Sequence, residues 1–328
     1  MKRSSLSLCI FLSAFSFTLP AQAYLPWVTP DAHGISMGYS GVAENPDANA
    51  MFWNASKLAF AEGKCGVSVS YQPWNRNYIP DGNFVSSAVF FRPDTLSALG
   101  VSVRYLNEGT RDVMLSSGAI IGRFQPNESS VDVAYARRLG NALSASLTVR
   151  YSNANPDGLP NYRKVNYISG DAGLFYKGKT FAFLSKKSSF TAGLSVTNIG
   201  HSIDYQVYNP DEHLPLTARA GGALLIAPGE KQSLTVTGEF VYYANEVPRS
   251  CSAGGGIDYT IGNWLSLRGG YRYDWDWDYH LLTAGLGLHY QLFRLDFSYT
   301  HVSYDRAPLQ NNLGFTFSAN FGGKKPGD

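Results

Sequence analysis

Residues 143–151 read LSASLTVRY, and every second side chain in this stretch is apolar. Leu143, Leu147, Val149 and Tyr151 share one parity, while serine, threonine and arginine occupy the other. Because successive side chains of a strand point to opposite faces, this pattern predicts a β-strand with one apolar and one polar face. The alternation continues for about ten residues or more, roughly twice the usual strand length in soluble proteins. A strand of this length suits a tilted crossing of a lipid bilayer.

The same alternation recurs along the chain and predicts about fourteen strands. They are expected at residues 65–72, 83–91, 97–106, 128–138, 142–153, 165–177, 189–198, 215–227, 232–244, 249–260, 264–274, 279–289, 292–303 and 309–321. A soluble β-sandwich would turn the apolar faces inward, whereas a transmembrane antiparallel β-barrel would turn them to lipid. The polar faces favour the barrel, because they carry mid-strand charges of both signs: Arg104, Asp132, Arg150, Asp171, Arg219, Glu239, Asp258, Arg268 and Asp296.

The chain divides into four predicted parts. Residues 1–23 have a basic start, an apolar run and an A-x-A site, which together are typical of a secretory signal peptide. Residues 24–64 are rich in aromatic and apolar side chains and are expected to plug the barrel lumen, with a short helix at 50–61; the alternative is a segment that hangs in the periplasm. Residues 65–321 would form the barrel, and 322–328 a C-terminal tail.

The predicted connections alternate in length. Short turns fall at 92–96, 138–141, 228–231, 262–263 and 290–291, and longer loops at 73–82, 107–127, 153–164 and 199–214. Bacterial outer-membrane barrels place short turns in the periplasm, so both termini are expected there. Residues 181–188 form a connection that is longer than this scheme predicts, and 243–249 one that is shorter.

Composition and motifs argue against several classes of chemistry. The net charge of +2 and the scattered Lys and Arg do not suggest nucleic-acid binding. Cys65 and Cys251, the two cysteines beyond the signal peptide, leave a disulfide and two thiols both open. Residues 34–38 fit G-x-S-x-G, but they lack the strand and helix that a nucleophile elbow needs. We therefore expect no enzyme, no cofactor and no metal centre.

Residues 271–280, YRYDWDWDYH, combine an aromatic row with a charged row. The aromatic row continues the lipid-facing parity of Leu265 and Leu267, as the interfacial girdle of a membrane barrel does. The charged row would lie on the lumen or loop side. The alternative is a weak site for a hard cation, because loops rich in carboxylates can bind one.

The N-terminal region carries a family likeness. Residues 25–81, LPWVTPDAHGISMGYSGVAENPDANAMFWNASKLAFAEGKCGVSVSYQPWNRNYIPD, resemble the N-terminus of the PorV family of the type IX secretion system in Bacteroidetes. FQPNESSVDVAYARRL at 124–139, LLTAGLGLHYQLFRLDFSY at 281–299 and PLQNNLGFTFSANFG at 308–322 extend the resemblance along the chain. It implies a barrel similar to FadL in the bacterial outer membrane.

The resemblance also implies a function and partners. A PorV-like protein would act as a shuttle that binds the C-terminal secretion domain of cargo at a large translocon barrel of the SprA/Sov type. It would then deliver this cargo to a surface attachment complex that contains a PorU-type peptidase. Outer-membrane lipid is the other expected partner. A FadL-like transporter of hydrophobic small molecules is the alternative, and an outer-membrane enzyme is a third hypothesis.

Docking of cargo would use the extracellular loops, through aromatic anchors and polar contacts. The predicted residues are Trp74, Asn75, Arg76 and Tyr78 in the first loop and Asp274, Trp275, Asp276, Trp277 and Asp278 in the sixth. The residues predicted to form the plug are Trp27, Asp31, Met37, Asp47, Asn49, Trp53 and Asn54.

Overall fold

The computed structural model describes residues 25–76, 79–114, 117–160, 162–201, 203, 213–244, 250–275, 278–303 and 311–322 of the 328-residue chain. The predicted signal peptide lies outside these residues, as does all of the predicted tail except Gly322. Among the helices in the described ranges, none is long and apolar enough to cross a membrane.

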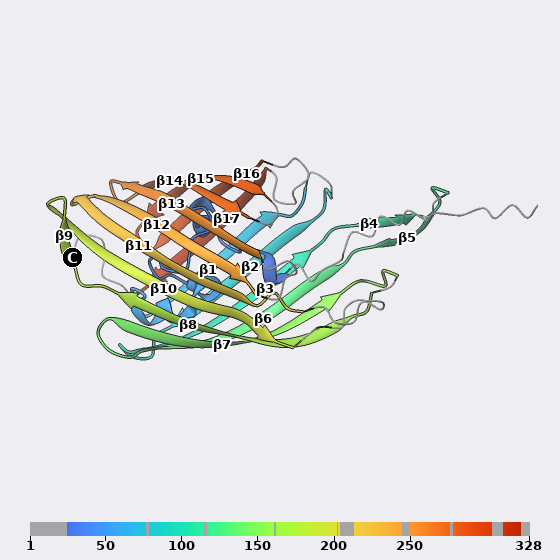
Figure 1. The fold of residues 1–328 in the computed structure, drawn as a ribbon, viewed down its shortest axis with the longest axis horizontal. Helices are drawn as coiled ribbons and strands as arrows, with labels where there is room; N and C mark the ends of the chain where they lie inside the picture. Colours follow the sequence, from blue (N-terminus) through green and yellow to red (C-terminus); the bar gives the residue numbers. More distant parts are fainter. Residues whose placement is uncertain are drawn as a thin grey trace, which may run out of the picture.

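Fourteen long strands form one closed antiparallel sheet, as the alternation predicts (Figure 1). They are β1 (Cys65–Pro73), β2 (Asn83–Phe91), β3 (Ser97–Asn107), β6 (Asn127–Arg138), β7 (Leu143–Asn155), β8 (Val165–Lys177), β10 (Lys186–Gly200), β11 (Thr217–Gly229), β12 (Gln232–Tyr243), β13 (Ser250–Ile261), β14 (Leu265–Asp274), β15 (Tyr279–Tyr290), β16 (Phe293–Val302) and β17 (Asn312–Phe321). Each strand pairs with its neighbour along the chain. β17 also pairs with β1, from Cys65 opposite Phe321 to Tyr71 opposite Phe315, which closes the ring.

Two connections contain strands that the alternation did not predict. β4 (Arg111–Met114) and β5 (Ile120–Phe124) form a hairpin in the loop between β3 and β6. β9 (Phe181–Phe183) pairs with the start of β10 and lengthens the connection after β8. β9 and the β4–β5 hairpin lie at opposite ends of the barrel (Figure 1). We call these ends the short-turn end, with β9, and the long-loop end, with β4–β5.

The two faces of the sheet differ as the barrel interpretation requires. Outward side chains are apolar and exposed, and Leu147, for example, is 70% exposed. Inward side chains are polar and buried, and the predicted mid-strand charges among them pair across neighbouring strands. Arg150 on β7 lies 2.8 Å from Asp132 on β6 and 2.6 Å from Asp171 on β8. A charge buried with such partners avoids the cost of an unpaired one, so the lumen wall is both charged and packed.

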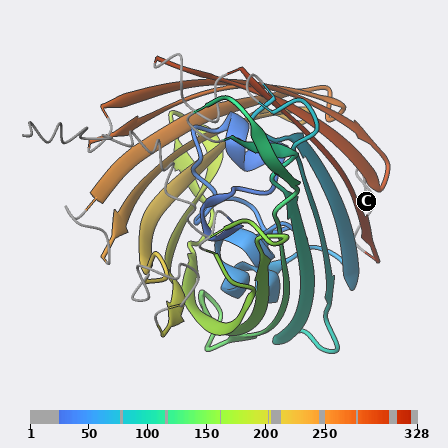
Figure 2. The same ribbon diagram turned by 90° about the vertical axis from the view of Figure 1, so that its right-hand side faces the viewer.

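Residues 25–64 lie inside this ring (Figure 2). They form η1 (Leu25–Trp27), α1 (Ala32–Ser36), α2 (Ala50–Trp53) and η2 (Ala55–Phe60). The single helix predicted at 50–61 is wrong, because Asn54 adopts an extended backbone and divides it. The Asn54 side chain accepts a hydrogen bond from Ser56 N and starts the second turn instead, a competition with the helix backbone that is typical of asparagine.

Candidate functional site

The irregular backbone of residues 25–61 is hydrogen-bonded by side chains of the barrel wall. A buried peptide group without a partner is costly, and short helical turns leave many such groups unpaired. Wall side chains supply the partners. Three of them accept hydrogen bonds from the segment: Glu128 from Leu25 N at 3.2 Å, Thr316 from Ala32 N at 2.9 Å and Glu239 from Val42 N at 2.8 Å. Two others donate to it: Thr191 to Ala43 O at 2.6 Å and Ser144 to Ser56 O at 2.7 Å. The polar wall is therefore complementary to the segment it encloses.

Glycines on the lumen face let this segment lie directly against strand backbone. A Cβ atom on Gly254 would lie 2.1 Å from Gly38 O, and one on Gly270 would lie 2.2 Å from Gly38 N. On β10, a Cβ on Gly193 would lie 2.1 Å from Val42 O. Real Cβ atoms do not approach backbone this closely, so a larger residue at these positions must displace the segment.

Two of the residues predicted for the plug, Asp31 and Trp53, form the centre of the enclosed segment. Asp31 caps α1 by accepting a hydrogen bond from Gly34 N at 3.0 Å, and its other oxygen accepts from Trp53 Nε1 at 2.8 Å. Gly34 and Gly41 leave room for the Trp53 ring on one side. The Arg219 guanidinium lies 5.4 Å from the ring centroid, which adds a cation–π contact from the wall.

Asn54 connects this centre to the barrel. Its side-chain amide donates to Val42 O at 3.2 Å and to Leu174 O of β8 at 2.9 Å. The remaining predicted residues also lie in the enclosed segment: Asp47 accepts from Asn49 N at 2.9 Å, Met37 is fully buried, and the Trp27 ring lies 4.9 Å from that of Tyr243. The fold thus brings Asp31 together with Trp53, and Asp47 with Asn49. That these residues block the lumen stays a prediction.

The enclosed segment buries two ionisable groups, Asp31 and Lys57, and among the described residues neither has an oppositely charged partner within 4 Å. Burial and the negative charge of Asp47 raise the pKa of Asp31 to about 6. Burial lowers the pKa of Lys57, whose ammonium group donates to Gly41 O at 2.6 Å. Burial is unfavourable for the charged form of such groups, so we expect the attachment of the segment to depend on pH.

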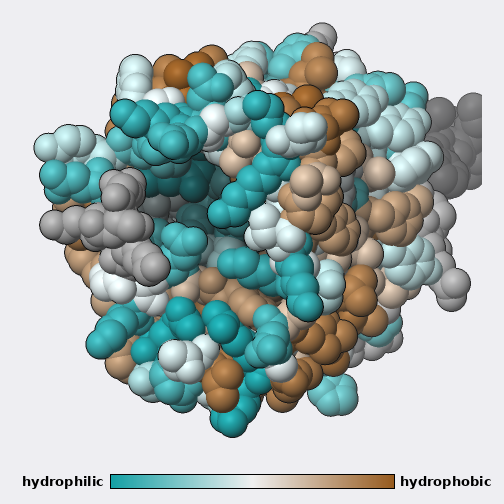
Figure 3. Space-filling model, turned by 90° about the vertical axis from the view of Figure 1, so that its left-hand side faces the viewer, coloured by the Kyte–Doolittle hydropathy of each residue, from teal (hydrophilic) through white to brown (hydrophobic). Residues whose placement is uncertain are grey.

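A second buried group of titratable residues faces a cavity at the short-turn end. His33 Nε2 lies 3.5 Å from Glu44 Oε2 and 3.8 Å from Asp258 Oδ2. Burial raises the pKa of Glu44 well above its usual range, and burial together with Arg294 lowers the pKa of His33 well below its own. The cavity beside them has a volume of about 250 Å³. Figure 3, which views this end, shows a hydrophilic hollow.

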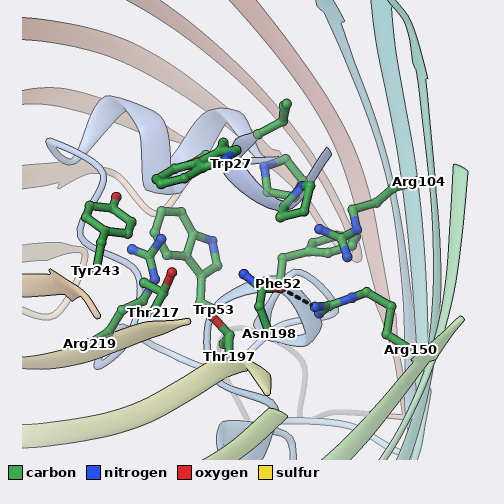
Figure 4. A pocket seen from close by; sticks show the side chains of 14 residues that line it. Trp27, Phe52, Trp53, Arg104, Arg150, Thr197, Asn198, Thr217, Arg219 and Tyr243 are labelled. Atoms are coloured by element: carbon green, nitrogen blue, oxygen red, sulfur yellow. Dashed lines mark hydrogen bonds between the residues drawn. The ribbon is translucent and has the colours of Figure 1, made fainter. Parts of the chain in front are cut away.

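At the long-loop end, residues 26–30 cover a small polar pocket (Figure 4). Trp27, Trp53 and Arg219 lie on one side of it, and Arg104 and Arg150 on the other. Its volume is about 40 Å³, which is room for two or three water molecules. The pocket can therefore hold water or a small polar group, but it is too small for a hydrophobic molecule.

The first predicted docking loop is only partly exposed. The Trp74 ring is 7% exposed and packs with Leu25, Val28, Phe84 and Leu106. This indole belongs to the core in the structure and offers no docking surface there. Arg76 lies at the surface and donates to Tyr71 Oη at 3.0 Å, and Tyr78 lies outside the described residues.

The other predicted docking loop forms an exposed aromatic cluster at the long-loop end. Trp275 is 48% exposed, and its ring lies 5.4 Å from Tyr273 and 6.2 Å from Phe240. Tyr273 also lies 4.8 Å from the His280 ring, and its hydroxyl donates to Asp278 at 2.7 Å. Asp276 and Trp277 lie outside the described residues. We call Phe240, Tyr273, Trp275 and His280 the aromatic cluster.

Sequence reasoning missed cations that hold the enclosed segment from the short-turn end. Arg138 donates to Ala59 O at 2.9 Å, and its guanidinium lies 4.2 Å from the Phe60 ring centroid. Arg92 donates to Ala61 O. Both arginines lie at strand ends, where a basic residue is typical of any turn. Only their position beside a row of inward side chains could have suggested that they bind the enclosed segment.

Several chemical alternatives find no support in the described residues. No three His, Cys, Asp or Glu side chains there are grouped as a metal site requires. The Ser36 hydroxyl of the G-x-S-x-G motif is buried and donates to His33 O at 2.7 Å, and no disulfide joins Cys65 to Cys251.

A comparison with protein families decides the relationship. The family described as "Type IX secretion system protein PorV" matches residues 19–250. The chain belongs to the PorV family. PorV-family proteins are secretion components of the outer membrane, so this barrel is an outer-membrane protein of that system. Among curated protein sequences, none matches this PorV-family chain significantly.

Solved structures confirm the FadL-like fold of this PorV-family barrel. The toluene transporter TodX of Pseudomonas putida is 11% identical with a TM-score of 0.58, and the match covers 90% of this chain and 99% of TodX. The toluene transporter TbuX of Ralstonia pickettii is 12% identical with a TM-score of 0.55, over 89% and 98% of the two chains. A FadL homologue of Pseudomonas aeruginosa is also 12% identical, with a TM-score of 0.50 over 89% and 97%. At these identities the likeness concerns the fold alone.

Proposed function

We propose that this barrel is a shuttle of type IX secretion. It binds the C-terminal secretion domain of cargo at the large translocon barrel and delivers the cargo to a PorU-type attachment complex at the cell surface. The observation that carries this proposal is that the lumen is occupied by the chain's own residues 25–64, hydrogen-bonded to the wall and packed against strand glycines. Residues 25–64 would thus act as a plug, and cargo would be handled by the outside of the barrel.

The FadL-like fold favours one other function, the transport of hydrophobic molecules. Binding such a molecule requires an apolar pocket of a few hundred Å³. The pocket under residues 26–30 has about 40 Å³ and the one beside Phe52 about 10 Å³, and both contain charged side chains. The cavity of about 250 Å³ at the short-turn end is lined mainly by polar and charged side chains, and the apolar space of about 530 Å³ lies on the outer wall rather than in the lumen. The pockets described in the lumen therefore favour the shuttle over the transporter.

The aromatic cluster is the surface on which we propose that cargo docks. Aromatic side chains give large contact areas with few rotatable bonds, and they dominate many protein interfaces. The hydroxyl of Tyr273 and the imidazole of His280 add hydrogen-bonding groups beside the exposed indole of Trp275. The flanking Asp274 and Asp278 would contribute polar contacts at the rim.

This role sets the orientation of the barrel. Cargo is bound outside the cell, so the long-loop end would face outward and the short-turn end the periplasm, as is general in bacterial outer-membrane barrels. The C-terminal end of β17, where Phe321 lies opposite Cys65, would then be on the periplasmic side. Leu25, the first described residue, lies at the long-loop end instead, where it packs with Trp74 and Leu106, so this orientation agrees with the prediction of periplasmic termini at the C-terminal end alone.

Two experiments test the proposal. After deletion of the gene, proteins with C-terminal secretion domains should disappear from the cell surface and culture fluid, and complementation should restore them. Normal secretion combined with impaired uptake of an apolar compound would favour the transporter instead.

A photo-crosslinking residue at Trp275 should then capture the cargo domain in cells. The matched control is Tyr290, which is 71% exposed but lies at the short-turn end. Equal capture at both positions, or capture only at Tyr290, would argue against docking at the aromatic cluster.

A further inference from the structure

A groove runs across the outer wall of the barrel over β6, β7, β8 and β10. Strand register explains it. One outward row contains Arg137, Ala145, Leu174 and Leu194, and the next contains Tyr135, Leu147, Ala172 and Val196. Each row thus has one alanine among larger side chains, and the two alanines lie diagonally to each other. Since Ala145 and Ala172 fill little space, they form the floor of a channel between ridges.

The groove has the size and polarity of a lipid site. Its volume is about 530 Å³, within the range of sites for drug-sized ligands. Its walls are formed mainly by leucine, valine and alanine, and Leu147 and Leu194 on its rim are more than half exposed. The floor is one small side chain wide, so a single acyl chain fits it better than the convex wall of another barrel.

Cations gather at the short-turn end of this groove. Arg137 lies on the groove itself, with Nη1 donating to Tyr135 Oη at 3.2 Å. Farther toward this end, Lys179 is exposed on the connection after β8, and Lys186 and Lys187 are exposed at the start of β10. Residues 134–147 and 172–201 contain no Asp or Glu, whereas the turns that hold Lys64, Arg92 and Lys231 also hold Glu62, Asp94 and Glu230. Asp94, in the turn before β3, interacts electrostatically with Arg137, but it already accepts hydrogen bonds from Leu96 N and Ser97 N.

The β9–β10 hairpin adds apolar side chains beside these lysines. Phe181 and Phe183 are about 40% exposed and Leu184 is 78% exposed. Leu184 and Ser185 form the turn, both with positive φ, where glycine or asparagine is usual. Apolar side chains interleaved with lysines are typical of segments that lie at a membrane interface. The connection after β8, which is longer than the alternation of turns and loops predicts, can therefore contact the membrane interface, whereas a simple turn could not.

We propose that the groove and the hairpin bind an anionic phospholipid of the leaflet at the short-turn end. One acyl chain lies over Ala145 and Ala172, and the headgroup phosphate contacts Arg137. The lysines of the hairpin attract the phosphate at longer range, because Lys187 lies seven residues along β10 from Leu194 in the row of Arg137, roughly 23 Å at 3.3 Å per residue. The proposal rests on the orientation given above, in which this leaflet faces the periplasm. The probe is phosphatidylglycerol, with zwitterionic phosphatidylcholine as the neutral comparison.

Native mass spectrometry of the purified barrel tests the proposal, after exchange from nanodiscs that contain both lipids. The wild type should retain phosphatidylglycerol in preference to phosphatidylcholine. Arg137→Gln should lower this retention about fivefold, and Lys186→Gln with Lys187→Gln should lower it by a smaller factor, because these charges act over a longer and partly screened distance. Ala172→Leu should fill the floor and reduce retention of either lipid. Because purified protein is used, the result does not depend on the secretion assay.

Matched variants separate a specific site from general lipid contact. Ala284→Leu places the same side chain on the outward face of β15, opposite the open space at Gly269, and Lys231→Gln removes a lysine from another short turn. Both should retain lipid like the wild type. Equal loss in the control variants, or no preference for phosphatidylglycerol in the wild type, would overturn the proposal. If Ala172→Leu does not fold, Arg137→Gln alone tests the proposal. Unchanged retention of phosphatidylglycerol in Arg137→Gln would also contradict the proposal.

Discussion

Asp31 is the carboxyl group through which pH acts on the enclosed segment. It is 2% exposed, and burial with the nearby charge of Asp47 raises its pKa from 3.8 to about 6. The folded state therefore favours the protonated form. Its contribution to stability is fully present below about pH 4 and is lost as the pH rises through about 6.

Asp31→Asn removes this titration, although it also weakens the bond from Trp53 Nε1. Relative to the variant, the wild type should lose about 3 kcal/mol of unfolding free energy between low and neutral pH, since each pKa unit corresponds to about 1.4 kcal/mol. Urea unfolding in micelles across this range measures the difference. The difference cancels contributions from His33, whose lowered pKa has the opposite sign.

Asp94→Asn is a control in which the pH dependence of stability should have the opposite sign. Hydrogen bonds from Leu96 N and Ser97 N lower the pKa of Asp94, so here the wild type should gain stability relative to the variant as the pH rises through the acid range. A pH-independent difference for Asp31→Asn would contradict the role assigned to that carboxyl group.

Single residues show where sequence reasoning reached its limit. Asp31, Trp53 and Asn54 could be predicted as part of a packed segment, because aromatic and polar side chains so close together seldom belong to a free tail. Lys57 and Arg138 could not. Their bonds to Gly41 O and Ala59 O depend on how an irregular backbone is threaded through the ring, and no periodicity encodes that path.

Glycines let the enclosed segment pack directly against β13–β15. Adding one methyl group at such a glycine should therefore displace the segment. A Cβ on Gly270 would lie 2.2 Å from Gly38 N, whereas a Cβ on Gly269, the next residue, has nothing within 4 Å. Gly270→Ala should therefore destabilise the barrel by about 1–3 kcal/mol, the usual cost of overpacking, and make residues 25–64 accessible to protease. Gly269→Ala should leave both properties unchanged. Similar behaviour of the two variants would show that the segment does not contact β14 as described.

The elements themselves were predictable to different degrees. The fourteen long strands follow from alternation, because a bilayer outside and a polar filling inside impose opposite chemistry on the two faces. The helix at 50–61 was wrong, since Asn54 bonds to Val42 O and Leu174 O rather than continuing a helical turn. β4, β5 and β9 are short pairings inside loops, and their three to five residues carry too little pattern to be recognised.

The whole molecule is a barrel whose interior is largely occupied by its own chain, apart from a polar cavity of about 250 Å³ at the short-turn end. The wall provides paired charges and hydroxyl groups, and the chain's own residues 25–64 use them as hydrogen-bond partners. A hydrophobic solute would need an apolar path instead. The same polar wall would line a hydrated channel if the segment were absent, so the proposed closure would depend on the segment rather than on the diameter of the ring.

Electrical recording in planar bilayers tests this view of the molecule. The wild type should show no steady open conductance, because the spaces of about 40 and 10 Å³ under residues 26–30 and beside Phe52 are too small for a hydrated path. Gly270→Ala should open intermittently as the segment is displaced, and Gly269→Ala should remain closed. Since the exposed lumen would carry both Arg150 and Arg268 and their acidic partners, the open state should discriminate little between small cations and anions. A large steady conductance in the wild type would mean that residues 25–64 do not block the barrel in a membrane, and the shuttle proposal would lose the observation on which it rests.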